Sequence, residues 1–519
     1  MSGNGVCRVL QSAMMAGLLF WPAIPAAQEG AADPSLSDSV RELRQQIQEL
    51  KAAVSEVRSE AQQYRAETVE LRRELAAMRA QSNPQSQGAT ESASAIKAAP
   101  AEQTADAAAN REEHASRLDE QYQLLSGKID EQYQTKVESA SRYRVRLSGI
   151  VLLNLFGNLG TVDNIDYPAV VYDHPPGVSD RSAGATLRQS QIGLEVFGPQ
   201  MAGARTRADL VVDLAGGFPR AQNGINAGLL RLRTGTMRMD WAHTSIVGGQ
   251  DGLFFSPASP TSFATLAEPA LAYAGNLWAW APQIRVEHRF SLGDDSTLVV
   301  QGGILDPQSG EAPQLTYYRQ PQAAERSGVP AFATRVAWTR TLFGQPLRVG
   351  AGGYYNRQDY GFNRNVDGWV GAADWEVPLS HAFSVSGKLY RGRALGGLGV
   401  SEWRSVLFSG DPGAPDTQVR AINTAGGWAQ LKYRPVSKLE FNGAFGEDAP
   451  YMADLRAFAF PQAYGDPTLS KNQGSLFNVI YRPRSDLLFS AEYRHLKTYT
   501  TDNGAYSAGH VNLTMGVMF

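Results

Sequence analysis

The sequence has little of what defines several large classes of protein. Its single cysteine excludes a disulfide framework and a cysteine-based zinc or iron–sulfur site. No apolar run approaches the roughly 20 residues that a membrane-spanning helix needs, which excludes a helical membrane protein. The formal net charge of −3 over 519 residues gives no whole-chain reason to expect nucleic-acid binding. A soluble enzyme and an all-β protein remain, and the 51 glycines, 20 tyrosines and 20 phenylalanines favour the second.

Catalytic and metal-binding motifs are also missing. The seven histidines are scattered and show no ligand spacing such as H-E-x-x-H, and there is no phosphate-binding P-loop. A serine–histidine hydrolase has no supporting motif either. We therefore predict no enzyme activity, no catalytic residue, no metal and no cofactor.

The N-terminal segment has the pattern of a secretory signal peptide. Arg8 precedes the apolar stretch 9–21, which is followed by small residues and prolines up to Gln28. A positive residue, a short apolar core and small residues in this order are typical of such signals. A buried helix is the alternative, but Pro22 and Pro25 would break it. We expect residues 1–27 to direct export.

A heptad pattern follows the signal. Over residues 36–78 the core-type residues recur with alternating steps of four and three, which predicts a coiled coil. With Val40 as position a, the g and e positions pair opposite charges, such as Glu60 with Arg65, in a parallel arrangement only. We expect residues 28–79 to form a parallel, oligomer-forming coil, although a solvated single helix is the alternative and the number of helices stays open. The residues predicted to form the seam are Val40, Leu43, Ile47, Leu50, Val54, Val57, Leu71 and Leu75.

The pattern changes twice more before the C-terminal part. Residues 80–110 are rich in Ser, Ala and Gln and predict a flexible linker. Residues 111–141 predict a second helical segment with a near-repeat at an offset of eleven residues. From Tyr143 onward the period falls to two, so residues 142–519 are predicted to form an outer-membrane β-barrel.

Strands of alternating apolar and polar residues open and close this last part. Residues 143–155 alternate in this way, and so do residues 510–519, which end in Phe519. Short turns and long loops alternate between the strands, as in outer-membrane barrels, whereas a soluble β-sandwich or propeller has no need of this asymmetry. Sixteen strands are an even number, so both chain ends lie on the turn side, in the periplasm. The fourteen inner strands lie near residues 185–198, 203–216, 227–241, 244–250, 282–292, 296–305, 329–344, 346–357, 367–379, 382–393, 425–434, 438–447, 473–483 and 486–499.

A barrel of this size encloses water, so a loop is expected to narrow it. The segment 251–281 is rich in aromatic residues and proline, which suggests an ordered structure. A surface epitope or a trimer latch is an equally open interpretation of this segment. The constriction candidates are Asp251, Phe254, Phe255, Glu268, Trp278 and Trp280.

Arginine dominates the charge of the barrel part. The residues after 141 hold 34 basic and 31 acidic side chains, and 29 of the basic ones are arginine. An arginine facing lipid at the bilayer midplane costs about 2–4 kcal/mol, so these side chains must face water, where guanidinium groups can guide carboxylates or phosphates. Alternatively, they only pair with inward acids such as Glu195 and Glu287. The predicted pore-lining set is Arg144, Arg146, Arg205, Arg207, Arg231, Arg233, Arg285 and Arg289.

Besides the coil, five segments of the barrel part carry a recognisable pattern: Arg144–Gly149, Leu230–Arg233, Val247–Gln250, Gly275–Trp278 and Pro282–Arg285. Together they resemble the DcaP-like trimeric porins, with the phosphate-selective porins as a second match. The resemblance covers most of residues 36–519. It implies trimers of sixteen-stranded barrels with a periplasmic coiled coil that admit small anions such as dicarboxylates, and its inward arginines carry over to Arg231, Arg233 and Arg285.

Together these patterns predict an all-β transmembrane barrel behind an N-terminal α-helical coiled coil. The predicted function is an outer-membrane porin for passive diffusion of small hydrophilic solutes, biased to anions such as dicarboxylates or phosphate. Its expected partners are two further copies in a homotrimer, outer-membrane lipids and small anionic solutes, with peptidoglycan as a candidate for the coil and no nucleic acid. Its expected location is the outer membrane of a Gram-negative-type cell, with the coil in the periplasm. The alternative is a structural envelope protein whose barrel anchors a periplasmic tether or spacer.

Overall fold

A computed structural model gives the fold of the C-terminal part of the chain. The predicted signal peptide, the coiled-coil seam from Val40 to Leu75, the linker and the second helix lie outside the described residues and stay predictions. The structure describes residues 144–218, 228–293, 295–311, 318–400, 403–458 and 469–519.

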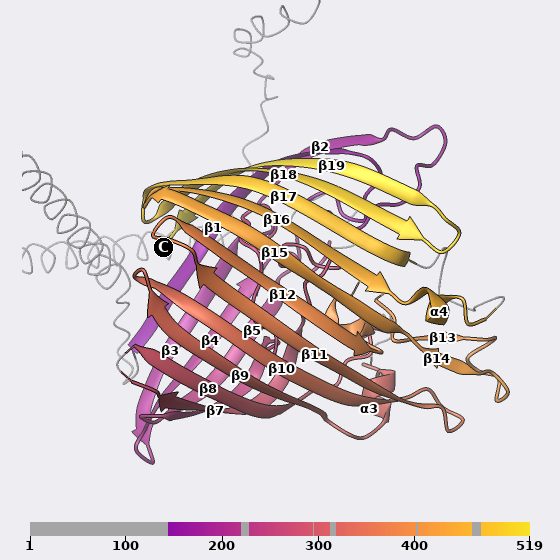
Figure 1. Ribbon diagram of the computed structural model, residues 1–519, viewed down its shortest axis with the longest axis horizontal. Helices are drawn as coiled ribbons and strands as arrows, with labels where there is room; N and C mark the ends of the chain where they lie inside the picture. The colour runs from indigo at the N-terminus through magenta and orange to yellow at the C-terminus, as the bar shows by residue number, and fades with distance from the viewer. Residues whose placement is uncertain (1–143, 219–227, 294, 312–317, 401–402, 459–468) are drawn as a thin grey trace, which may run out of the picture. The chain divides into compact units, whose positions relative to one another are not determined.

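The described strands form one antiparallel sheet that closes on itself. Its first strand, β1 (Arg144–Leu159), pairs with its last, β19 (Ala505–Met518), with Leu153 opposite Met515 (Figure 1). Around the sheet the strands follow one another in chain order, which gives a closed up-and-down barrel. The strands between these two are β2 (Arg181–Thr186), β3 (Gln191–Met201), β4 (Ala204–Asp213), β5 (Arg231–Asp240), β6 (Thr244–Gly252), β7 (Trp280–Ser291), β8 (Ser296–Leu305), β9 (Ala331–Leu342), β10 (Gln345–Asp359), β11 (Asn365–Pro378), β12 (Phe383–Arg393), β15 (Asn423–Val436), β16 (Leu439–Pro450), β17 (Leu469–Arg484) and β18 (Leu487–Thr500).

Two of these strands share one crossing of the barrel. β2 pairs with the second half of β1, and β3 pairs with its first half, with Asn154 opposite Thr186 and Arg144 opposite Phe197. The 17 strands that the described residues contribute to the sheet therefore make sixteen crossings, which confirms the predicted number. The strand is interrupted between β2 and β3, and Arg188 and Gln189 in this interruption are buried.

The barrel is apolar outside and polar inside. On β19, Val511 and Leu513 are 50% and 52% exposed. Asn512, which lies between them in the sequence, and His510, which precedes Val511, are fully buried. This inverted pattern follows from the alternating sequence and is that of a barrel that meets lipid outside and water inside. Within the described ranges no helix has the length and apolar character needed to cross a bilayer.

Short and long connections fall on opposite ends of the barrel. The turn after β9 consists of Phe343 and Gly344, and the φ of +70° at Gly344 is the left-handed conformation that such a turn favours in glycine. We call this end the turn side; both β1 and β19 have their outer termini here. The other end, the loop side, carries the long connections, including a small hairpin of β13 (Val406–Phe408) and β14 (Val419–Ala421). It also carries the short helices α3 (Ala323–Arg326), η1 (Gly396–Leu398) and α4 (Met452–Leu455).

The largest apolar core lies between inward-folded loops and the barrel wall. Phe255 is fully buried there and stacks on Tyr354 of β10 with ring centroids 5.2 Å apart. Glycines on the wall leave room for the loop backbone, since a Cβ atom at Gly446 of β16 would come within 2.2 Å of the Ala274 carbonyl oxygen. The interior is thus partly filled with protein.

Candidate functional site: a narrowed pore

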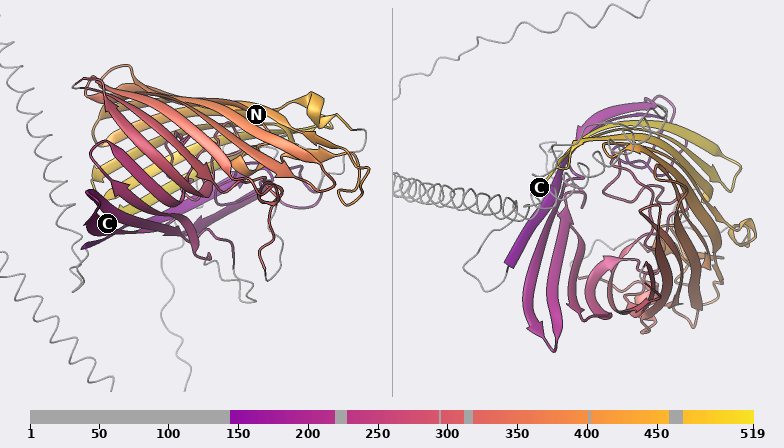
Figure 2. Two further views of the ribbon diagram at one scale, coloured as in Figure 1. Left: turned by 90° about the horizontal axis from the view of Figure 1, so that it is seen from below. Right: turned by 60° about the vertical axis from the view of Figure 1, so that its left-hand side comes forward.

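The connection between β6 and β7, residues 253–279, lies inside the ring of strands and is called the pore loop here (Figure 2, right). Its middle is bound to the wall of the first strands. Asn154 Nδ2 of β1 donates to the Phe263 carbonyl at 3.1 Å, and Gln189 Nε2 donates to the Ala264 carbonyl at 2.9 Å. These amide side chains face inward and fix the position of the loop backbone.

The neighbouring stretch of the pore loop is bound to β15, β17 and β18. The Thr261 amide donates to Gln430 Oε1 at 2.7 Å, and its carbonyl accepts from Asn478 Nδ2 at 2.9 Å. The Ser262 hydroxyl donates to Glu492 Oε2 at 2.6 Å. The pore loop is therefore bound to several separate parts of the wall.

Lys388 of β12 joins the two ends of the pore loop. Its side chain is fully buried, and Nζ donates to the Ser256 carbonyl at 2.9 Å, to Asn276 Oδ1 at 2.9 Å and to the Leu277 carbonyl at 3.0 Å. All three acceptors are neutral groups of the loop. One ammonium group thus ties both ends of the loop to the wall.

A cavity of about 540 Å³ remains between the pore loop and the wall of β5 to β8. The wall contributes Arg233, Arg285 and Gln301, and the end of β6 contributes Asp251. The loop contributes mainly apolar, aromatic and proline side chains. These include Leu253, Phe254, Pro257, Pro260, Leu266, Pro269, Leu277 and Trp278, with Trp280 at the start of β7.

The arginines beside this cavity are interleaved with carboxylates. Arg285 contacts Asp251 at 2.8 Å and Glu287 at 2.9 Å. Arg238 of β5 also reaches Glu287, at 2.8 Å, and holds Asp240 at 2.7 Å. The positive charge on this wall is therefore partly neutralised by hydrogen-bonded partners.

Arg231 and Arg233 hold the pore loop as well as facing the lumen. Each donates to Asp213 at 2.8 Å, and they donate at 2.6 Å to the backbone carbonyls of residues 267 and 266 respectively. Their guanidinium carbons lie 5.0 and 4.7 Å from the centre of the Trp280 ring, within cation–π range. These two arginines thus also hold the pore loop in place, a structural role that the sequence alone did not indicate.

The other predicted arginines lie toward the turn side. Arg146 and Arg207 lie 3.5 and 3.6 Å from Glu195, and Arg289 lies 3.9 Å from Glu287. Arg144 and Arg205 are exposed. The eight predicted arginines and Arg238 make nine inward arginines on these described strands. Six inward acids lie on the same strands, so the excess is three positive charges. The acids are Glu195, Asp209, Asp213, Asp240, Asp251 and Glu287.

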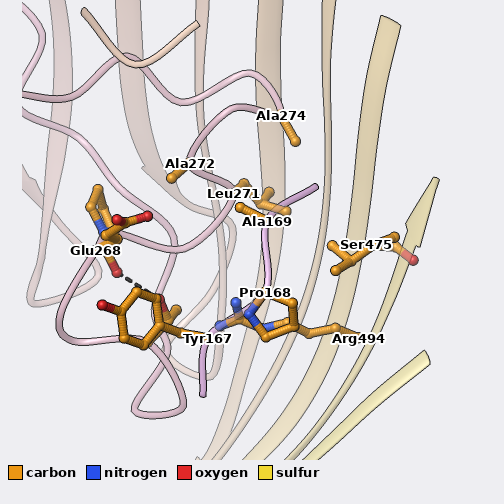
Figure 3. Close-up of a pocket in the computed structure, with 12 residues that line it drawn as sticks. Tyr167, Pro168, Ala169, Glu268, Leu271, Ala272, Ala274, Ser475 and Arg494 are labelled. Carbon is orange, nitrogen blue, oxygen red and sulfur yellow. Dashed lines mark hydrogen bonds between the residues drawn. The ribbon is translucent and has the colours of Figure 1, made fainter. Parts of the chain in front are cut away.

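Two of the six constriction candidates do not line the cavity. Phe255 points away from it, because its ring is buried against Tyr354. Glu268 lies on the other side of the loop, where it faces Tyr167 (Figure 3). Burial, together with repulsion by Asp163, raises the pKa of Glu268 to about 7, and Arg231 opposes the rise. The other four candidates do border the cavity.

Sequence reasoning missed several charged groups of the lumen. Lys388 sits at an inward position of β12, so alternation could have found it. Arg238 could not be found in this way, because the register shift between β4 and β5 near residues 232–234 reverses which positions of β5 face inward. Arg188, which binds Asp166 in a buried pair, lies in the interruption between β2 and β3, where alternation gives no signal. Among the described residues no group of three or more His, Cys, Asp or Glu could hold a metal ion.

Comparison with known proteins links the chain to one fold. No protein-family model matches the sequence, and no curated protein matches it. The structure is similar to the outer membrane channel DcaP of Acinetobacter baumannii, with 17% identity, a TM-score of 0.57 and coverage of 74% of this chain and 100% of that one. It also matches an anion-selective porin from Comamonas acidovorans at 12% identity and a TM-score of 0.45, over 73% of this chain and 100% of that one. The first match confirms, at the level of the fold, the resemblance to DcaP-like porins.

Proposed function

We propose that this protein is an outer-membrane porin through which small hydrophilic solutes diffuse, with a bias to anions. The observation that carries the proposal is a barrel with apolar residues outside and polar residues inside, which holds a cavity of about 540 Å³ beside an arginine-rich wall. The fold shared with the DcaP channel supports it. The apolar outer face suits lipid, and the polar lumen suits water and dissolved ions.

The cavity offers a path on one side of the pore loop. Arg285 and Arg233 bring positive charge to its wall, and Asp251 brings a single negative charge. Guanidinium groups bind carboxylate and phosphate oxygens through paired hydrogen bonds. Arg285 and Arg233 already donate hydrogen bonds to carboxylates of the protein. A passing anion must compete with these carboxylates for the same donors, so it is bound weakly and released easily, as conduction requires. Small dicarboxylates and phosphate are the solutes that this charge pattern favours.

The location and assembly that we propose rest on the sequence. We infer that residues 1–27 direct export, and that the coil of residues 28–79 lies in the periplasm and joins three copies. Both ends of the barrel chain lie on the turn side, which is the periplasmic side of outer-membrane barrels.

The experiment is the reversal potential of single channels in a planar bilayer under asymmetric potassium chloride. We expect the wild type to prefer chloride. Arg285→Gln should shift the reversal potential toward cations, and Asp251→Asn should shift it further toward anions, because it frees the guanidinium of Arg285. Arg391→Gln is the matched control, since Arg391 is an exposed residue of β12 against Tyr451. A wild-type channel that prefers cations would contradict the anion bias.

A further inference from the structure

The outer face of β16 to β18 changes character near the loop side. Phe477 of β17 and Tyr493 of β18 lie opposite each other, and both point outward with 54% and 51% of their surface exposed. The next outward pair toward the loop side is Ser475 with His495, so the apolar band ends here. Beyond it come two rows of polar side chains. They lie on β16, β17 and β18, which are adjacent strands of the sheet (Figure 1).

These two rows form what we call the lysine patch: Glu447, Gln473, Lys497, Lys471 and Tyr499. In the first row Gln473 lies between Glu447 and Lys497, and in the second Lys471 lies opposite Tyr499. Gln473 donates to Glu447 and accepts from the Tyr499 hydroxyl at 3.4 Å, which fixes the ring. The patch is thus ordered by its own hydrogen bonds.

Two ammonium groups converge on one ring in this patch. Lys471 Nζ lies 4.5 Å and Lys497 Nζ 4.8 Å from the centre of the Tyr499 ring. Glu447 is the nearby carboxylate, 3.9 Å from Lys471 Nζ. Both ammonium groups lie within 5 Å of the same ring centre, so an anion beside Tyr499 is attracted by two positive charges. The carboxylate compensates one of the two charges at most.

The height of the patch identifies the source of the anion. With a strand rise of about 3.3 Å per residue and the usual tilt, the row of Gln473 and Lys497 lies about 10 Å beyond the last apolar pair. This is the level of the lipid headgroups, if the barrel spans a membrane as proposed above. We propose that the lysine patch binds the phosphate of a lipid headgroup in the leaflet at the loop side. Lys471 and Lys497 contact the phosphate oxygens, and Tyr499 supports both ammonium groups.

The test uses the full chain, delipidated in detergent and titrated with lipid A that carries its phosphates or has lost them, with bound lipid counted by native mass spectrometry. We expect a preference for the phosphorylated form. Lys471→Gln and Lys497→Gln should each weaken binding by about fivefold, the effect of one basic charge at a membrane surface. Glu447→Gln should tighten binding, because it removes the competing carboxylate. Lys438→Gln, an exposed lysine at the turn side, is the control and should change nothing.

Several outcomes overturn the proposal. Equal binding of both forms of lipid A, or an equal loss in the Lys438→Gln control, would remove the case for this site. Inorganic phosphate that displaces the lipid at equal concentration would assign the patch to a soluble anion instead. Bilayer conductance of the same samples separates this proposal from the proposed function. Normal conductance without a preference for phosphorylated lipid A would contradict the lysine-patch proposal alone. A lipid preference without conductance would contradict the porin function alone.

Discussion

Lys388 shows how a single charge can set the shape of the pore. A buried ammonium group is costly unless its hydrogen bonds are made, and here all three are made to neutral groups of the pore loop. Lys388→Met should weaken the attachment of the loop by about 2 kcal/mol, since charge-assisted hydrogen bonds are lost. Single-channel recordings should then show a noisier open state.

Lys432→Met is the matched control for this change. Lys432 lies on the adjacent strand β15 and pairs with Glu440 at 3.5 Å instead of with the pore loop. Its loss should leave the open-state noise as in the wild type. A quiet Lys388→Met channel with unchanged conductance would show that the other anchors of the loop suffice.

Glu268 makes the contact between the pore loop and the segment 160–180 sensitive to pH. It faces Asp163, Tyr167, Tyr273 and Arg231, and burial with Asp163 raises its pKa from 4.5 to about 7. The folded state therefore holds more protons than the unfolded state between these two values, so stability falls as the pH rises through that window and is level above it. Hydrogen exchange of the pore-loop amides should accelerate, beyond its intrinsic pH dependence, as the pH rises from 4.5 to about 7, and should follow the intrinsic dependence alone above that. Glu268→Gln should abolish this extra acceleration, and its persistence in the variant would assign the effect to another group.

At the scale of elements, the backbone of the pore loop also passes close to wall positions that lack a side chain, among them Gly446 of β16. Gly446→Val places a side chain where the Ala274 carbonyl now lies, so we expect the loop to be pushed off β16 toward the wall of β5 to β8. The cavity should shrink and the single-channel conductance should fall. Gly443→Val on the same strand meets nothing within 4 Å and is the control. Equal conductance in both variants would contradict this view of the loop.

The strands could be predicted from the sequence because their signal is local. On β19, apolar Val511, Leu513 and Met515 alternate with polar residues, and this alternation alone gives the strand and its two faces. The break between β2 and β3 was not predicted, because residues 187–190 are defined by their contacts with the pore loop rather than by a local pattern.

Alternation gives the face of a side chain but not its neighbours. It placed Arg231 and Arg233 inside the barrel, yet their shared bonds to Asp213 depend on a register shift between β4 and β5. Alternation also could not show that the Phe255 side chain of the pore loop packs against the barrel wall. That position depends on contact with Tyr354, a residue about a hundred positions further along the chain. The site's composition was therefore predictable, and its pairing was not.

At the scale of the whole molecule, the predicted coil and the barrel should have separable tasks. We expect deletion of residues 28–79 to turn trimers into single barrels while the conductance of each barrel is retained, because the lining residues of the described cavity belong to the barrel. Light scattering in detergent and bilayer recordings on the same sample measure the two properties. Loss of envelope spacing in cells with normal solute uptake would instead support the tether interpretation of the coil.

The central claim is that this chain forms a water-filled, positively biased channel through a membrane. The most direct measurement adds the purified full-length protein to a planar bilayer that separates two concentrations of potassium chloride. The account predicts discrete upward conductance steps and a reversal potential on the chloride side of zero. A bilayer that stays silent, or a protein that remains soluble and folded without detergent, would contradict it.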